Sequence, residues 1–159
     1  MITILVGTMT GTAELVAEEV ERVLCEDGLA ASVQRMDGLF AEVFATGETF
    51  LICTSTYGKG NVPDNALQLY SSLKQIQPDL SKVGFGLIGL GDSRYPRTFA
   101  NGGKRFDEIL TELGAHRIGT PLTLNASSGL SVVEAAKFWS ADWIVAVRQS
   151  IKDQEERRF

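Results

Sequence analysis

Short apolar or β-branched runs alternate along the chain with longer segments in which apolar residues recur at helical spacing. The runs predict five strands, at residues 2–6, 31–36, 49–55, 83–90 and about 117–124. Several of these runs are almost continuously apolar, which is the pattern of parallel strands buried on both faces. Strands that alternate with helices are typical of βαβ units. We therefore expect an α/β fold with a five-stranded parallel sheet covered by helices on both faces.

Four helices are expected around these strands. The first begins near residues 10–12 and ends at about 26, and the second begins at Pro63, a residue that suits the first position of a helix. The third covers about 98–113, and the fourth begins with the capping pattern of Ser131 and Glu134. A weaker pattern favours a short helix within 37–47. The side chains expected to face inward are Leu15, Val16, Val20, Val23, Leu24, Leu67, Tyr70, Leu73, Ile76, Phe106, Ile109, Leu110, Leu113, Val132, Ala136, Trp139, Trp143 and Val147.

Length and composition narrow the function classes. A chain of 159 residues predicts one domain, at residues 1–150, followed by a charged and frayed tail at 151–159. The 15 basic and 20 acidic residues give a net charge of −5, which disfavours binding to nucleic acid or to an anionic membrane. One histidine and two cysteines exclude a Cys/His zinc centre and an iron–sulfur cluster held by this chain alone. The N-terminal apolar run is too short for a signal peptide, so we expect a soluble cytoplasmic protein with reduced thiols.

The loop after the first predicted strand has the composition of a phosphate site. It carries the hydroxyls of Thr8, Thr10 and Thr12 on alternate residues, and it leads into the start of a helix. Free backbone N–H groups and the helix dipole attract anions at such a position. The loop contains no lysine, as a polyphosphate-binding P-loop would, and no G-x-G-x-x-G pattern is completed, because position 94 is arginine. The sequence therefore predicts a site for a terminal monophosphate.

Two further loops bring aromatic residues to the same edge, where the carboxyl ends of parallel strands bind ligands. Tyr57 lies in the loop after the third strand and Tyr95 in the loop after the fourth, and glycines flank both. Two aromatic side chains across a phosphate site predict a flat conjugated ring as the ligand.

Taken together, these motifs resemble the flavodoxin family. The resemblance is carried by Thr8-x-Thr10-Gly11-Thr12-Ala13-Glu14, Ser55-Thr56-Tyr57-Gly58-x-Gly60-x-x-Pro63-Asp64-Asn65 and Gly89-Leu90-Gly91-Asp92-Ser93-x-Tyr95. It extends from residue 2 to about 147, and it is greatest to short flavodoxins of the MioC type and to the FMN domains of diflavin reductases. It implies a doubly wound sheet in the order 2-1-3-4-5.

The resemblance also implies FMN as the cofactor and assigns roles to residues. The phosphate would lie on Thr8, Met9, Thr10, Gly11, Thr12 and Ala13, and Tyr57 and Tyr95 would flank the isoalloxazine ring. Asp92 would lie near the pyrimidine edge, and a carbonyl at Gly58 would turn toward flavin N5 and stabilise the neutral semiquinone. The remaining ring contacts would come from Ser55, Thr56, Lys59, Gly60, Leu90, Gly91 and Phe99.

Two departures from the family pattern affect this assignment. Lys59 stands where an acidic residue is common, and the segment from Tyr95 to Phe99 is one residue longer than usual. The cations of Lys59 and Arg97 near the flavin would make the second reduction step easier.

The function that the resemblance implies is that of a monomeric electron carrier. It would pass single electrons, by way of the semiquinone and hydroquinone, from an NAD(P)H-dependent reductase to an acceptor enzyme, with no catalytic residue or metal of its own. The alternative is an FMN-dependent quinone or azo reductase that takes hydride directly from NAD(P)H. A phosphoacceptor receiver domain would need carboxylates where this chain has Gly7-Thr8 and Ser55-Thr56.

The remaining candidate residues favour structural roles. His116 has no partner for acyl-transfer chemistry, and Cys53, within an apolar strand, is expected to be a buried, inert thiol. Cys25 lies beside two acids, which do not activate a thiol. The acidic first helix is either a solvated face or a docking surface for a basic reductase, and no role is assigned to 125–129.

Overall fold

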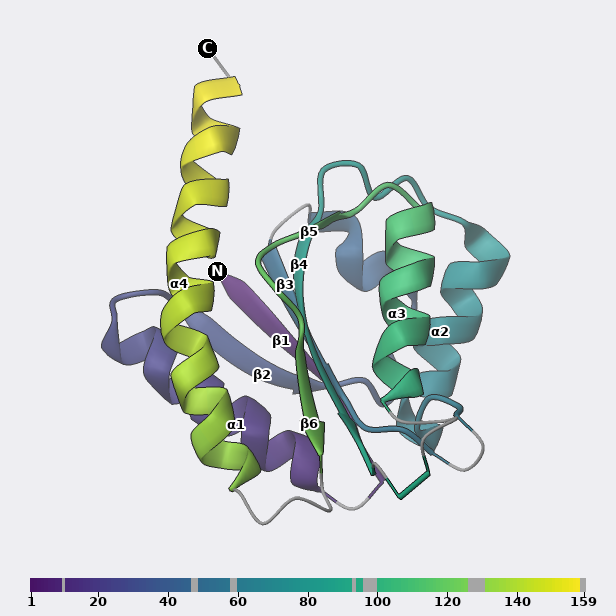
Figure 1. The fold of residues 1–159 in the computed structure, drawn as a ribbon. Coiled ribbons are helices and arrows are strands. Elements are labelled where there is room, and N and C mark those ends of the chain that lie inside the picture. The colour runs from purple at the N-terminus through teal and green to yellow at the C-terminus, as the bar shows by residue number, and fades with distance from the viewer. Residues whose placement is uncertain are drawn as a thin grey trace.

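The computed structural model describes residues 1–9, 11–46, 49–57, 60–92, 94–95, 100–125 and 131–157, and these form a parallel sheet of six strands (Figure 1). The strand order is β2-β1-β3-β4, and β5 and β6 both pair with the outer edge of β4. The order 2-1-3-4-5 is therefore confirmed, with the fifth place shared by two short strands. The strands are β1 (Ile2–Gly7), β2 (Ala31–Arg35), β3 (Thr49–Thr54), β4 (Gly84–Gly91), β5 (His116–Arg117) and β6 (Leu122–Asn125).

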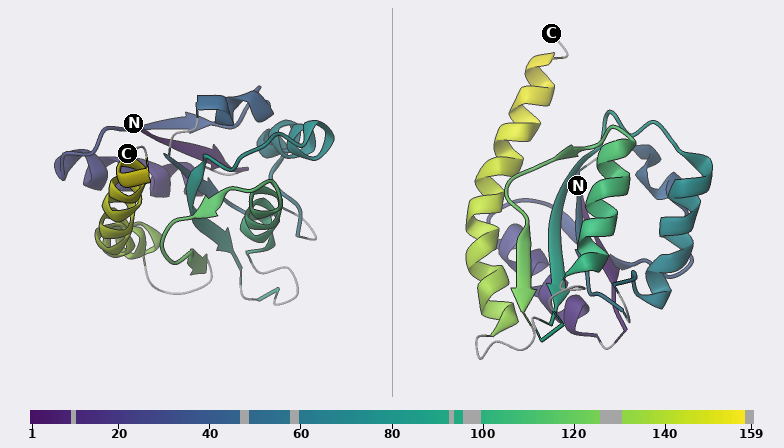
Figure 2. Two further views of the ribbon diagram at one scale, coloured as in Figure 1. Left: turned by 90° about the horizontal axis from the view of Figure 1, so that it is seen from above. Right: turned by 45° about the vertical axis from the view of Figure 1, so that its right-hand side comes forward.

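Helices cover both faces of this sheet and separate two apolar cores (Figures 1 and 2). Alternate residues of β1 point to opposite sides, so that Ile4 joins one core and Leu5 the other. The first core is packed under α1 and α4, and the second under α2, α3 and a short 3-10 helix, η1. The helices are α1 (Thr12–Glu26), η1 (Ala41–Thr46), α2 (Asp64–Ile76), α3 (Asn101–Glu112) and α4 (Val132–Arg157).

The fifth predicted strand is interrupted, which the apolar pattern did not indicate. Gly119 has a φ of 72°, in the left-handed region that breaks an extended path. On either side of it, the carbonyl oxygens of Ile118 and Thr120 accept hydrogen bonds from the indole nitrogens of Trp143, at 3.0 Å, and Trp139, at 2.8 Å. The interruption thus accommodates the two tryptophans of α4.

Three of the side chains expected to face inward are exposed: Leu15, Leu67 and Ile76. In α2 the prediction is confirmed for Leu73, which is buried, and for Tyr70, which packs against the core, whereas Ala66 and Leu69 complete the inward stripe.

Several helix ends also differ from the predictions. Pro63 is the N-cap of α2 rather than its first helical residue, and α3 begins at Asn101 because Ala100 is left-handed, with a φ of 54°. The capping interaction of Ser131 is confirmed, since its hydroxyl accepts the Glu134 N–H at 3.3 Å. α4 continues to Arg157 beyond the body of the domain, so the expected frayed tail is helical up to that residue (Figure 1).

Within the described residues, no helix combines the length and the apolar character that a membrane span requires.

Candidate functional site

The loop between β1 and α1 leaves a helix start without a capping side chain. Gly11 is the N-cap residue, with a left-handed φ of 93°, and its own N–H is taken by the hydroxyl of the buried Thr8, at 2.9 Å. The N–H groups of the first turn have no partner inside a helix, and here the N-cap residue has no side chain to bond them. Donors therefore remain for an anion at Thr12 and Ala13, as the sequence predicts. Thr10 lies outside the described residues.

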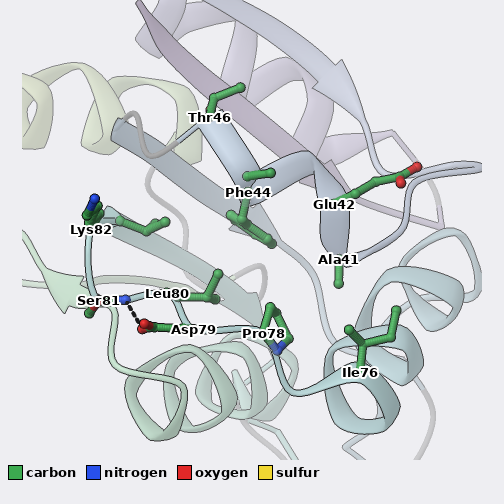
Figure 3. A pocket seen from close by; sticks show the side chains of 12 residues that line it. Ala41, Glu42, Phe44, Thr46, Ile76, Pro78, Asp79, Leu80, Ser81 and Lys82 are labelled. Atoms are coloured by element: carbon green, nitrogen blue, oxygen red, sulfur yellow. Dashed lines mark hydrogen bonds between the residues drawn. The ribbon is translucent and has the colours of Figure 1, made fainter.

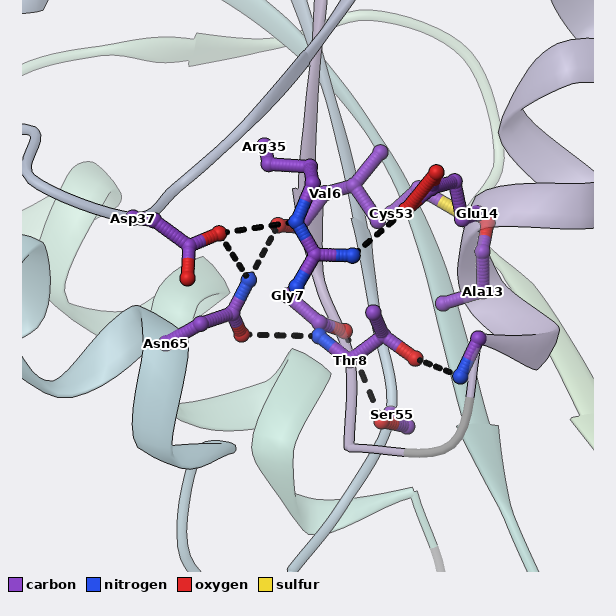
Figure 4. A network of polar contacts seen from close by, with 11 residues as sticks. Val6, Gly7, Thr8, Ala13, Glu14, Arg35, Asp37, Cys53, Ser55 and Asn65 are labelled. Carbon is purple, nitrogen blue, oxygen red and sulfur yellow. Dashed lines mark hydrogen bonds and ion pairs between the residues drawn. The ribbon is translucent and has the colours of Figure 1, made fainter.

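A network of polar side chains supports this loop (Figure 4). Asn65, at the start of α2, accepts the Thr8 N–H at 2.9 Å and donates to the Val6 carbonyl at 3.1 Å. The same amide donates to Asp37 at 3.2 Å, and Asp37 pairs with Arg35. Asn65 thus joins the end of β1 to α2, so that it sets the position of the Thr8 peptide.

The acidic side of the network extends to α1. Arg35 forms ion pairs with Asp37, at 2.9 Å, and with Glu14 of α1, at 2.6 Å. The hydrogen bond from Asn65, and then that from Arg35, lower the pKa of Asp37 below its ordinary value. Asp37 therefore remains an anion that orients the Asn65 amide. In the sequence, Asn65 is part of a family motif, and nothing there indicates this role.

The loop after β3 is a closed turn. Two backbone hydrogen bonds of 2.8 Å, in both directions, pair Tyr57 with Asn61. Gly60 has a φ of 96°, which requires glycine, and the Tyr57 side chain is 46% exposed. Gly58 and Lys59 lie outside the described residues. The predicted contact of the Gly58 carbonyl with flavin N5 and the predicted effect of the Lys59 cation on the flavin therefore stay predictions.

Thr56 ties this turn to its neighbours. Its hydroxyl donates to the Leu90 carbonyl of β4, at 3.1 Å, and accepts the N–H of Gly102 in α3, at 3.0 Å. One side chain therefore connects the loop after β3, the end of β4 and the start of α3. A ring contact of Thr56, as the resemblance implies, would come from its backbone.

The loop after β4 presents the second tyrosine. Tyr95 is 64% exposed, and its N–H donates to the Asp92 carbonyl at 3.0 Å. The Asp92 carboxylate forms an ion pair with Arg94, which the sequence did not predict. Leu90 is buried, Gly91 and Asp92 are partly exposed, and Arg97 and Phe99 lie outside the described residues.

The strand register brings these loops together. Gly7 of β1 is aligned with Thr54 of β3, and Thr54 is aligned with Gly89 of β4, so the three loops leave the sheet at one level. The edge combines an uncapped helix start, threonine hydroxyls and two exposed tyrosines. These groups fit a phosphate joined to a flat ring.

The structure supports the structural roles expected for the other candidate residues. Cys53 is fully buried, its thiol donates to the Ala13 carbonyl at 3.3 Å, and burial raises its pKa to about 12, so it is not a nucleophile. His116 is exposed on β5, where it pairs with Gly84 at the opposite end of β4 from the three loops.

The acidic residues of α1 are largely engaged within the protein. Glu19 and Glu26 pair with Arg22 on the same helix, and Glu21 accepts the Val33 N–H at 2.9 Å. With Glu14 paired to Arg35, four of the five glutamates of α1 have a partner among the described residues. α1 therefore offers another protein less negative charge than its glutamates alone suggest.

A separate cavity of about 780 Å³ lies at the opposite edge of the sheet, before the first residues of β3 and β4 (Figure 3). Phe44 of η1, Ile76 of α2 and Leu80 are among its lining side chains, and Asp79 accepts the Ser81 N–H there, at 3.0 Å. None of the predicted flavin contacts lines it.

Comparisons with known proteins agree with the geometry. Residues 4–139 match the sequence profile of the flavodoxin family. A solved structure of a single-site mutant of a flavodoxin from Pseudomonas aeruginosa superimposes with a TM-score of 0.83 at 38% identity, covering 92% of this chain and 98% of that one. Protein MioC of Escherichia coli K12 is 32% identical over 143 residues, covering 90% of this chain and 95% of MioC. The sulfite reductase [NADPH] flavoprotein alpha-component of Mannheimia succiniciproducens is 32% identical over 148 residues, covering 92% of this chain and 24% of that protein.

Proposed function

We propose that this chain, which belongs to the flavodoxin family of FMN-binding electron carriers, passes single electrons from an NAD(P)H-dependent reductase to an acceptor enzyme. The similarity to a flavoprotein component named for NADPH supports a reductase of this kind as the donor. We further propose a cytoplasmic monomer, with one FMN domain at residues 1–150. The free thiols of Cys25 and Cys53 are compatible with a reducing compartment.

The observation that carries the proposal is the uncapped start of α1 at the same sheet edge as two loops that expose tyrosines. The phosphate of FMN would be held by residues 8–13, and its ring would lie between Tyr57 and Tyr95. The contacts of 55–60 and 90–92, and that of Phe99, complete the proposed site.

When bound, FMN supplies the redox chemistry, and the protein supplies binding and orientation. Thr8 and the first turn of α1 offer neutral donors to the phosphate. The tyrosines offer apolar faces that exclude water from the ring, and Thr56 fixes the spacing of the two loops that carry them. The alternative of a quinone or azo reductase is less favoured, because two flanking tyrosines leave little open ring surface for a nicotinamide.

The function is tested by rapid mixing of the FMN-loaded protein with NADPH, followed by flavin absorbance. We expect negligible reduction by NADPH alone, and rapid reduction once a catalytic amount of an NADPH-dependent flavodoxin reductase is added. Free FMN with the same reductase is the control. Fast reduction without the reductase would establish the direct hydride reaction instead.

Asn65 should control phosphate affinity rather than ring affinity. Replacing it by leucine leaves the Thr8 N–H without its acceptor, and an unpaired buried donor costs about 1 to 3 kcal/mol. We expect Asn65→Leu to raise the Kd for FMN about tenfold, since that corresponds to about 1.4 kcal/mol, and to change the Kd for riboflavin by less than about twofold. Fluorescence titration of the apoprotein with both flavins measures this.

The control for this substitution is Gln68→Leu, at an exposed position of the same helix. It should leave both affinities unchanged. If Asn65→Leu lowered the affinities for FMN and for riboflavin equally, this would show that the network does not act through the phosphate loop.

A further inference from the structure

Two side chains of α3 bond the same backbone oxygen in the turn after β3. The Gly60 carbonyl accepts the Asn101 side-chain amide at 2.8 Å and the Arg105 Nε–H at 2.7 Å. Asn101 and Arg105 are four residues apart and so lie on one face of the helix. Both side chains are partly buried, and the bond from the guanidinium is charge-assisted and short.

The turn itself is built for this contact. A Cβ on Gly60 would lie 2.7 Å from the Asn101 amide nitrogen, so the backbone of the turn is pressed directly against α3. The paired hydrogen bonds of Tyr57 and Asn61 close the turn from within, and Gly102 of α3 holds the preceding Thr56. α3 therefore contacts the turn on both sides of Tyr57.

We infer that Asn101 and Arg105 are positioning residues, which clamp the backbone of Gly60 to α3 and so fix the position of Tyr57 at the flavin site. This inference rests on the proposed function, because it requires the flavin ring to pack against Tyr57. The clamp acts on a neutral carbonyl through directed N–H donors. Its loss should therefore affect ring binding whether or not a charge is removed.

Amide hydrogen exchange of the apoprotein tests the clamp without any flavin. We expect exchange of the Tyr57 and Asn61 amides to become about tenfold faster in Arg105→Met, with a smaller increase in Asn101→Ala. Amides within β3, such as Ile52, should be unaffected. The control is Lys104→Met, which removes an exposed cation from the same helical turn and should change neither amide.

Flavin titration of the same variants tests the positioning role. We expect Arg105→Met to raise the Kd for FMN and for riboflavin by the same factor, about tenfold, and Asn101→Ala about threefold. The visible circular dichroism of bound FMN, which reports the environment of the ring, should change in both variants and not in Lys104→Met. The thermal unfolding midpoint of each apoprotein shows whether the variant is folded. If Arg105→Met does not fold, Asn101→Ala provides the test.

The outcomes separate the two claims. Unchanged exchange at Tyr57 and Asn61 overturns the clamp, even where wild-type protein binds FMN normally. Faster exchange with unchanged affinities and dichroism overturns the positioning role. A loss of affinity confined to FMN, or shared by Lys104→Met, overturns it as well. Failure of the wild-type protein to bind FMN contradicts the proposed function, while the exchange result still decides whether the clamp exists.

Discussion

Replacing Gly102 by alanine should destabilise the protein by about 2 kcal/mol and weaken FMN binding by more than about tenfold. The added Cβ would lie 2.4 Å from the Ser55 carbonyl oxygen and 3.2 Å from the Thr56 Cα, and both are backbone atoms. Overpacking of this kind costs about 1 to 3 kcal/mol or more, against a gain of about 1 kcal/mol for alanine within a helix. The start of α3 must move away, and the bond from the Gly102 N–H to Thr56 then lengthens.

Denaturant unfolding of the apoprotein and titration with FMN measure the two effects. Gly103→Ala is the matched comparison, because its Cβ would approach Gly89 only to 3.1 Å. We expect the neighbouring substitution to cost less in both measurements. A Gly102→Ala protein as stable as wild type would show that α3 adjusts without disturbing the loop after β3.

The second large effect is expected at Gly86, in the middle of β4. A Cβ there would lie 2.5 Å from three atoms of the Trp143 ring. Trp143 is 1% exposed, its indole N–H is bonded to Ile118, and its ring stacks on Trp139 at 5.4 Å, so it has no space to withdraw. We expect Gly86→Ala to lower the free energy of unfolding by about 3 kcal/mol. The FMN affinity of the folded protein should not change.

A double-mutant cycle identifies the cause. Phenylalanine at position 143 is smaller, so Gly86→Ala should cost at least about 1 kcal/mol less in a Trp143→Phe background than in wild type. Denaturant unfolding of the four proteins provides the comparison. Equal costs in the two backgrounds would mean that Gly86 is not required by the indole.

The sheet was predictable from the sequence because its central strands are almost continuously apolar. All six residues of β3 are buried. A run of this kind is typical of a parallel strand that is covered on both faces. The loop chemistry was predictable for a related reason: hydroxyls, glycines and tyrosines are unusual directly after buried strands. The resemblance to the flavodoxin family depends on these local features, and the resemblance in turn implied the strand order and the cofactor.

Features that depend on two distant segments were not predictable. The break in the fifth strand exists because tryptophans of α4 take the carbonyls of Ile118 and Thr120, and nothing within 117–124 indicates that contact. The expectation that Leu67 of α2 faces inward was wrong, because Leu67 and Ala66 are both acceptable inward residues until their neighbours are known. The roles of Asn65 and Arg105 are bonds to backbone atoms far along the chain, which leave no pattern in the sequence.

The stacked indoles of α4 are an intrinsic fluorescent probe of one part of the protein, the interrupted edge of the sheet. They are the only two tryptophans of the chain, and both are hydrogen-bonded to the interrupted edge of the sheet. Tryptophan emission therefore reports the docking of α4 on that edge, whereas flavin emission would report the three loops at the carboxyl ends. The two signals together distinguish detachment of a terminal helix from opening of the binding site in a single sample.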